Sequence, residues 1–203
     1  MKIVCYGDSN TYGYTPEGLR YDNRFSVLLK RYFNGKLDVF EEGYIGRTSA
    51  YMEKDIKRCG ILDVDSILLK YETIDFLIIM LGTNDYKIKN ARTLDDLKNN
   101  MDLLLDKINK LNICKKILII SPILLDKNIA KLDLDFDDLS YELSKESNKV
   151  YKELANKYNT LFLDAKDIAY PGADGEHFTL DGHFKLASEL IKIINKEVLN
   201  IEK

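Results

Sequence analysis

Apolar residues along this chain alternate between short continuous runs and longer stretches in which they recur every three or four positions. Short continuous runs are typical of strands that are buried on both faces, whereas the wider spacing is typical of helices with one buried face. The clearest run is 76–81, and the clearest helical pattern is 94–111. The predicted strands are 3–6, 37–40, 76–81, 117–120 and 161–163, and the predicted helices are 25–33, part of 50–70 with a break at Gly60, 94–111, 139–154 and 186–198.

Strands that alternate with helices along a chain predict a parallel sheet with helices on both faces. Five strands fit an open, doubly wound sheet of flavodoxin-like strand order better than a closed barrel. At 203 residues, without an internal repeat, a low-complexity tract or a linker, the chain is expected to form a single domain over residues 1–203. The fold class expected from the pattern is therefore α/β.

Glycines and small polar residues directly follow three of the predicted strands. Because the carboxyl ends of parallel strands meet at one edge of the sheet, where open α/β sheets bind their ligands, we expect these three segments to lie close together. Ser9 comes just past the first strand and is a candidate nucleophile, although an Asp-Ser-Asn triplet alone is more often a turn or a helix N-cap. The segments are Gly7-Asp8-Ser9-Asn10, Glu41-Glu42-Gly43-Tyr44-Ile45-Gly46-Arg47-Thr48-Ser49 and Gly82-Thr83-Asn84-Asp85.

Both histidines of the chain lie between the fifth predicted strand and the last helix, so they are expected at the same edge of the sheet as Ser9. A serine hydroxyl needs a base to accept its proton, and imidazole, with a pKa of ~6.5, is suited to this at neutral pH. The imidazole in turn needs an acceptor on its other nitrogen, which Asp174 can supply to His177 across a turn that contains Gly175. We expect His183 to be a structural residue near the start of the last helix.

A nucleophilic attack on an ester also needs hydrogen-bond donors where negative charge develops. The natural donors at this edge are the N–H groups of Ser9 and Gly46 and the side-chain amide of Asn84. Gly46 and Gly82 are also explained by tight turns that require a positive φ, which is compatible with the catalytic role. For Arg47 the hypothesis is an ion pair with Asp8 or Asp85 that stiffens the loops.

The segments at Gly7-Asp8-Ser9-Asn10, Gly46, Gly82-Thr83-Asn84-Asp85 and Asp174-Gly175-Glu176-His177 resemble, in this order, the four sequence blocks of the SGNH (GDSL) hydrolase family. The resemblance spans nearly the whole chain. It implies a three-layer α/β/α esterase or lipase in which Ser9 is the nucleophile, His177 the base and Asp174 its partner, with an oxyanion hole from Ser9, Gly46 and Asn84. Gly46-Arg47-Thr48 is most similar to the arylesterase and carbohydrate acetylesterase branch, which commonly has a tryptophan where this chain has Tyr12.

The favoured hypothesis is therefore a serine esterase that hydrolyses carboxylic esters, with short acyl chains or sugar acetyl groups as its substrates. An acyltransferase would use the same triad, and the sequence does not separate the two activities. A remote alternative is a flavin- or phosphate-binding module in which Ser9, Asn10, Thr11 and Thr15 cradle a phosphate. The nucleophile elbow Gly-x-Ser-x-Gly of ordinary α/β-hydrolases is not present, because residue 11 is Thr.

Four tyrosines indicate an aromatic-walled pocket: Tyr12, Tyr14, Tyr21 and Tyr44.

Composition and charge limit the partners. The formal net charge is only -3, from 33 acidic and 30 basic residues, so nothing attracts the chain to nucleic acid or to an anionic membrane. No apolar run approaches the ~18 residues that span a bilayer, so no membrane insertion is expected. We expect a small-molecule ester as partner and no cofactor or metal, and the sequence leaves room for a homo-oligomer.

The cysteines and the start of the chain predict a cytoplasmic protein. The three cysteines, Cys5, Cys59 and Cys114, are widely spaced without a metal-site pattern, and we interpret them as buried thiols of a reduced protein. A first strand that begins at Lys2 leaves no room for a secretory signal before it. Alternate aspartates over 133–138 suggest a calcium loop, but the glycine and the glutamate that an EF-hand needs are replaced by Asp138 and Ser144, which argues against it.

Overall fold

The computed structural model describes residues 1–201, and its centre is a five-stranded parallel sheet. The strands lie in the order β2-β1-β3-β4-β5, and every neighbouring pair is parallel. This arrangement confirms the predicted α/β class and its flavodoxin-like strand order. The strands are β1 (Lys2–Gly7), β2 (Asp38–Gly43), β3 (Phe76–Met80), β4 (Ile117–Ser121) and β5 (Leu161–Asp164).

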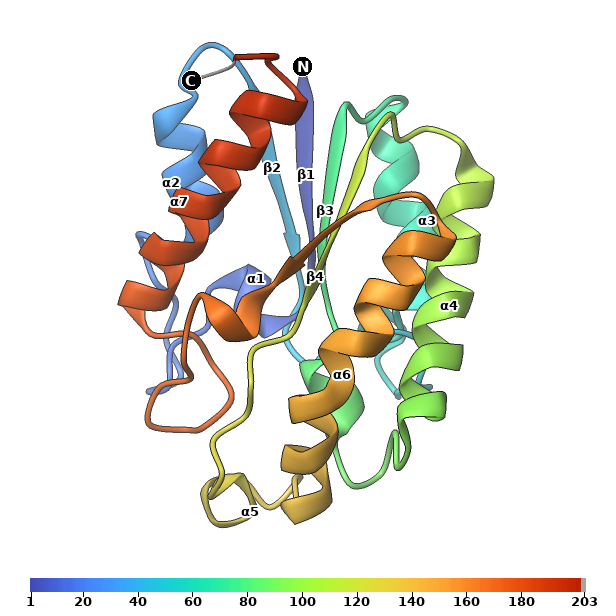
Figure 1. The fold of residues 1–203 in the computed structure, drawn as a ribbon, viewed down its shortest axis with the longest axis vertical. Coiled ribbons are helices and arrows are strands. Elements are labelled where there is room, and N and C mark those ends of the chain that lie inside the picture. Colours follow the sequence, from blue (N-terminus) through green and yellow to red (C-terminus); the bar gives the residue numbers. More distant parts are fainter. Residues whose placement is uncertain (202–203) are drawn as a thin grey trace.

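Helices cover both faces of the sheet and complete three layers (Figure 1). In the view of Figure 1, α2 and α7 lie to the left of the sheet, and α3, α4 and α6 lie to the right. The long helices are α2 (Phe25–Tyr32), α3 (Gly60–Leu68), α4 (Leu94–Leu111), α6 (Asp138–Lys157) and α7 (Leu180–Glu197). The short ones are α1 (Ser9–Tyr12), α5 (Ile129–Leu132), η1 (Ile56–Arg58), η2 (Leu69–Tyr71), η3 (Thr83–Tyr86) and η4 (Ala165–Asp167).

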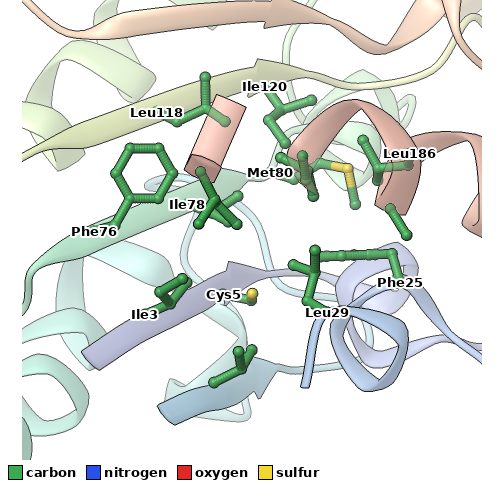
Figure 2. Packing of buried hydrophobic residues seen from close by; sticks show 14 of the residues in the cluster. Ile3, Cys5, Phe25, Leu29, Phe76, Ile78, Met80, Leu118, Ile120 and Leu186 are labelled. Carbon is green, nitrogen blue, oxygen red and sulfur yellow. The ribbon is translucent and has the colours of Figure 1, made fainter. Parts of the chain in front are cut away.

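The sheet divides the buried apolar residues into two main clusters, and β1 contributes to both because successive strand residues point to opposite faces. Ile3 and Cys5 belong to the cluster under α2 and α7, whereas Val4 and Tyr6 belong to the cluster under α3, α4 and α6. Residues 3–6 of β1 are buried on both faces of the sheet, which explains why this part of the sequence is a continuous apolar run. Figure 2 shows the first cluster, with Phe25 and Leu29 of α2 and Leu186 of α7 packed near Ile78 and Met80 of β3.

The structure differs from the predicted elements in two places that matter for the site. Ser9–Tyr12, where no helix is predicted, forms the short helix α1, because Asp8 caps its first turn through a hydrogen bond from the Asn10 N–H at 2.9 Å. Gly60 begins α3 instead of interrupting a helix. A Cβ at Gly60 would lie 2.8 Å from the carbonyl oxygens of Thr48 and Ser49, so the glycine is explained by close packing of backbones.

The acidic segment 133–138 has structural partners. Asp137 caps α6 by accepting a hydrogen bond from the Ser140 N–H at 2.9 Å, and Asp135 pairs with Lys87 at 2.8 Å. Asp133 accepts a hydrogen bond from the Asp135 N–H at 2.8 Å. Within residues 1–201, no group of three His, Cys, Asp or Glu residues is arranged to hold a metal ion.

Two further expectations concern bilayers and thiols. No helix in the described part of the chain has the length and the apolar character needed to cross a membrane. All three cysteines are free; Cys5 and Cys59 are buried, while Cys114 is half-buried rather than buried as predicted. Cys114 lies just before β4, outside the covered part of the sheet, which explains its partial exposure.

Candidate active site

Ser9 is the first residue of α1, directly beyond the carboxyl end of β1. Gly7, the last residue of the strand, has to be small because a Cβ there would lie 2.1 Å from the carbonyl oxygen of Met80 in β3. Asp8 then caps α1 and turns the chain sharply away from the sheet. The turn leaves Ser9 3% exposed, at the sheet edge that the sequence predicts for the site.

The loop before α7 brings His177 to this edge. Asp174 Oδ1 accepts hydrogen bonds from the N–H groups of Glu176 and His177, both at 3.1 Å, and Gly175 allows the turn with a φ of 82°. The other carboxylate oxygen, Asp174 Oδ2, lies 2.6 Å from His177 Nδ1. His177 Nε2 lies 2.8 Å from Ser9 Oγ. The three residues predicted as a triad are thus in hydrogen-bond contact in the order Ser9, His177, Asp174.

Asn10 holds the two ends of the chain together at the site. Its Nδ2 donates to the carbonyl oxygen of Glu176 at 3.0 Å, and its Oδ1 accepts from the Phe178 N–H at 2.8 Å. These two bonds fix the backbone on either side of His177 relative to α1. The side chain of Asn10 therefore joins the segment that carries Ser9 to the segment that carries His177. The sequence places Asn10 beside the nucleophile but does not predict these partners.

The surroundings of His177 favour its charged form despite its burial. Burial by itself lowers the pKa of an imidazole, but the hydrogen bond that His177 donates to Asp174 and the negative charges of Glu176, Asp174 and Asp8 raise the pKa of His177 above its ordinary value of 6.5. Burial likewise acts to raise the pKa of Asp174, yet its contacts with His177 prevail and lower it. Asp174 is therefore ionised at neutral pH and holds the proton of His177 on Nδ1.

The three predicted donors are placed on adjoining loops. Gly46 has a φ of 79°, as its turn requires, and the Tyr44 N–H just before it donates to the Gly7 carbonyl at 3.0 Å. Asn84 lies in η3, and its Nδ2 donates to the carbonyl oxygen of Arg47 at 3.2 Å, so its amide is held against the Gly46 loop. Within residues 1–201, the N–H groups of Ser9 and Gly46 have no backbone acceptor, which leaves both free for another partner.

Asp8, Gly82 and Asp85 support these loops. Asp85 is buried and accepts hydrogen bonds from the N–H and the hydroxyl of Ser49, which ties η3 to the end of the Gly46 loop. Burial raises the pKa of Asp85 to about 7, and burial also raises the pKa of Asp8. A Cβ at Gly82 would lie 1.9 Å from the hydroxyl oxygen of Tyr151, so only glycine fits there.

The hypothesis that Arg47 pairs with Asp8 or Asp85 is wrong. Its guanidinium is buried and forms an ion pair with Asp63 of α3, where Nη2 lies 2.8 Å from Asp63 Oδ2. Nη1 donates to the carbonyl oxygens of Gly7 at 2.7 Å and Glu42 at 2.5 Å, at the ends of β1 and β2. Asp63 lies in a stretch of weak periodicity, so nothing in the pattern indicates that it faces Arg47.

Two further side chains lie near His177: Tyr14, one of the four tyrosines predicted to wall a pocket, and Glu176, which was not singled out by the sequence. The ring of Tyr14 packs against the His177 imidazole with centroids 4.9 Å apart, whereas Tyr12 is covered by the guanidinium of Arg20, 4.0 Å above its ring. Glu176 Oε1 lies 3.9 Å from His177 Nδ1, and its side chain is only 12% exposed. The sole sequence signal for Glu176 is its place between Asp174 and His177.

Comparisons with known proteins agree with this geometry. A family model described as the GDSL-like Lipase/Acylhydrolase family matches residues 5–185. The chain belongs to this family. It is therefore a carboxylic ester hydrolase, whose substrates are small-molecule esters. No curated protein sequence matches the chain.

Solved structures confirm the predicted branch of the family. A carbohydrate acetylesterase family member from Sinorhizobium meliloti is 25% identical over 96% of this chain and 97% of that chain, with a TM-score of 0.85. The native aryl esterase of M. smegmatis is 28% identical over 96% of this chain and 98% of that chain, with a TM-score of 0.84. A putative arylesterase from Agrobacterium tumefaciens str. C58 is 25% identical over 96% and 98%, with a TM-score of 0.85.

Proposed function

We propose that the chain acts as a single-domain serine esterase with Ser9 as nucleophile, His177 as general base and Asp174 as the partner of the base. The observation that carries the proposal is the continuous pair of contacts from Ser9 Oγ to His177 Nε2 at 2.8 Å and from His177 Nδ1 to Asp174 Oδ2 at 2.6 Å. Nucleophile, base and orienting carboxylate within hydrogen-bond reach are the geometric signature of activated serine catalysis.

The proposed reaction proceeds through an acyl-enzyme. Ser9 Oγ attacks the ester carbonyl carbon while His177 Nε2 accepts the hydroxyl proton, and Asp174 stabilises the imidazolium that forms. The tetrahedral intermediate collapses, the C–O bond to the alcohol breaks, and His177 gives its proton to the departing alkoxide. A water molecule then transfers a proton to His177 and attacks the acyl carbon, which releases the acid and restores the Ser9 hydroxyl.

The proposed oxyanion hole consists of the N–H groups of Ser9 and Gly46 and the side-chain amide of Asn84. Two facts support it: both N–H groups have no backbone acceptor within residues 1–201, and Asn84 is held beside the Gly46 loop. A donor fixed in advance toward a developing alkoxide is worth ~10²–10³ in rate.

We propose esters with short acyl chains as substrates, including acetyl groups on sugars. The proposal is supported by the relatives, which are described as carbohydrate acetylesterases and aryl esterases. The ring of Tyr14 beside His177 offers an aromatic surface near the leaving group, on which a sugar or an aryl group can stack.

The decisive experiment compares Ser9→Ala with the wild type on p-nitrophenyl esters of increasing acyl length and on acetylated sugars. We expect Ser9→Ala to lose at least ~10³-fold in kcat, because the covalent intermediate cannot form. Ser188→Ala, which removes an exposed hydroxyl on α7, serves as the matched control and should retain full activity. Full hydrolysis by Ser9→Ala would refute the proposal. Product analysis with an added alcohol separates hydrolysis from acyl transfer.

A further inference from the structure

Glu176 is a mostly buried carboxyl group beside His177 that the proposed mechanism does not use. Its side chain is 12% exposed, and Oε1 lies 3.9 Å from His177 Nδ1. Within residues 1–201, no hydrogen-bond donor reaches its carboxylate oxygens. An ionised carboxylate that is largely shielded from solvent and has no donor from the protein is costly for the folded state, so this arrangement needs an explanation.

The backbone around Glu176 keeps its side chain near the imidazole. The Glu176 N–H donates to Asp174, and its carbonyl oxygen accepts from Asn10. Both backbone groups are thus committed to the turn that positions His177. Asp174 already accepts the hydrogen bond from His177 Nδ1, and Glu176 therefore faces the ring as a second carboxylate without a hydrogen bond of its own.

In the form of the enzyme that reacts, His177 is neutral, so the charge that Glu176 faces appears only when His177 accepts the proton of Ser9. An interaction that is stronger in the transition state than in the ground state raises kcat, whereas one present in both states does not. We propose that Glu176 is a positioning residue that acts through His177, as a second carboxylate that stabilises the imidazolium. This inference rests on the proposed role of His177 as general base.

The other charged groups around Glu176 determine how its protonation couples to that of His177. On its own loop it faces His177 and Asp174, after η3 it faces Lys87, and after α5 it faces Asp133. Asp8 also acts on His177, from the end of β1. Burial raises the pKa of Glu176 to about 7, so Glu176 and His177 titrate in the same range and must be followed together.

The pKa of His177 can be measured without any activity assay. The chain has only 2 histidines, and burial lowers the pKa of His183 to about 3, so His177 alone titrates near neutral pH in tag-free protein labelled with ¹⁵N-histidine. We expect Glu176→Gln to lower the pKa of His177 by about one unit, the equivalent of about 1.4 kcal/mol of imidazolium stabilisation. Glu142→Gln, an exposed position on α6, should leave it unchanged.

Steady-state kinetics on p-nitrophenyl acetate provide the second readout. We expect Glu176→Gln to lower kcat by about threefold to tenfold at an unchanged KM and to move the acidic limb of the pH profile to lower pH. Glu176→Asp keeps the negative charge, so the acidic limb of its pH profile should lie between that of Glu176→Gln and that of the wild type. An unchanged His177 pKa in Glu176→Gln would overturn the inference. A higher KM at an unchanged kcat would also overturn it and would assign Glu176 to substrate contact. Ser9→Ala tests the esterase mechanism, whereas Glu176→Gln tests the role of Glu176. The failure of one proposal can therefore be distinguished from the failure of the other.

Discussion

Arg47 and His177 are both buried basic side chains next to carboxylates, yet their surroundings differ in how completely the charges are paired. The guanidinium of Arg47 has an ion pair with Asp63 and donates to two carbonyl oxygens at the ends of β1 and β2. His177 has one carboxylate in hydrogen-bond contact and a second, Glu176, that has no donor. The charges around Arg47 are paired in the folded protein at all times. The charges around His177 are fully paired only when His177 carries a second proton.

The difference follows from the chemistry of the two side chains. Arginine is always charged, so its burial is stable only if its partners are present throughout, and the result is a rigid junction between two strands and α3. Histidine changes its charge near neutral pH. While His177 is neutral, the second carboxylate beside it, Glu176, has no positive charge to pair with, and the reaction supplies that charge. We therefore expect changes at Arg47 to affect the stability of the fold and changes at His177 to affect the reaction.

The largest expected effect is the loss of activity in His177→Gln. Without a base, the hydroxyl of Ser9 is a poor nucleophile, and kcat should fall by ~10⁴-fold or more, the equivalent of about 5.4 kcal/mol in the activation barrier. The melting temperature should stay within a few degrees of the wild type, because the side-chain amide of glutamine can still donate a hydrogen bond to a carboxylate. Parallel measurement of kcat and thermal unfolding checks this, and a large loss of stability would break the contrast with Arg47.

The next effect is the loss of stability in Arg47→Met. Removal of the guanidinium leaves Asp63 buried without its partner and removes the hydrogen bonds to the carbonyl oxygens of Gly7 and Glu42, which should reduce the free energy of unfolding by ~3–5 kcal/mol. Urea unfolding monitored by circular dichroism measures it. The double variant Arg47→Met/Asp63→Leu should recover part of the loss, since no charge remains unpaired. Wild-type stability in Arg47→Met would show that the cluster is not structural.

The two clusters also differ in how far the sequence could predict them. Ser9, Asp174 and His177 could be predicted to meet because their residue types suit one reaction and each follows a strand whose carboxyl end lies at the same edge of the sheet. The partners of Arg47 could not, because three of them are backbone carbonyls, which every residue carries. The remaining partner, Asp63, faces Arg47 only once α3 has packed against the sheet.

Glu176 and the short helix α1 were missed for other reasons. A single glutamate in a loop has no periodicity, and two of the charged groups that act on it, Lys87 and Asp133, lie far away in the sequence. The turn at Ser9 is a helix only because Asp8 caps it, and the sequence Asp-Ser-Asn fits a turn or a cap equally well. The strands were predicted more fully, since burial on both faces leaves an unbroken apolar run.

The smallest effect concerns His183, which shows what happens to a buried histidine that has no carboxylate beside it. His183 Nδ1 accepts the Phe25 N–H at 3.3 Å, aromatic rings surround it, and burial lowers its pKa to about 3. The unfolded chain therefore binds a proton near pH 6.5 that the folded chain does not, and stability falls as the pH drops below that value. Between pH 7.5 and 5.5, His183 should reduce the free energy of unfolding by about 1.4 kcal/mol relative to His183→Asn, as measured by urea unfolding at both pH values. An equal pH dependence in both proteins would mean that folding leaves the pKa of His183 unchanged, and the contrast between the two histidines would be lost.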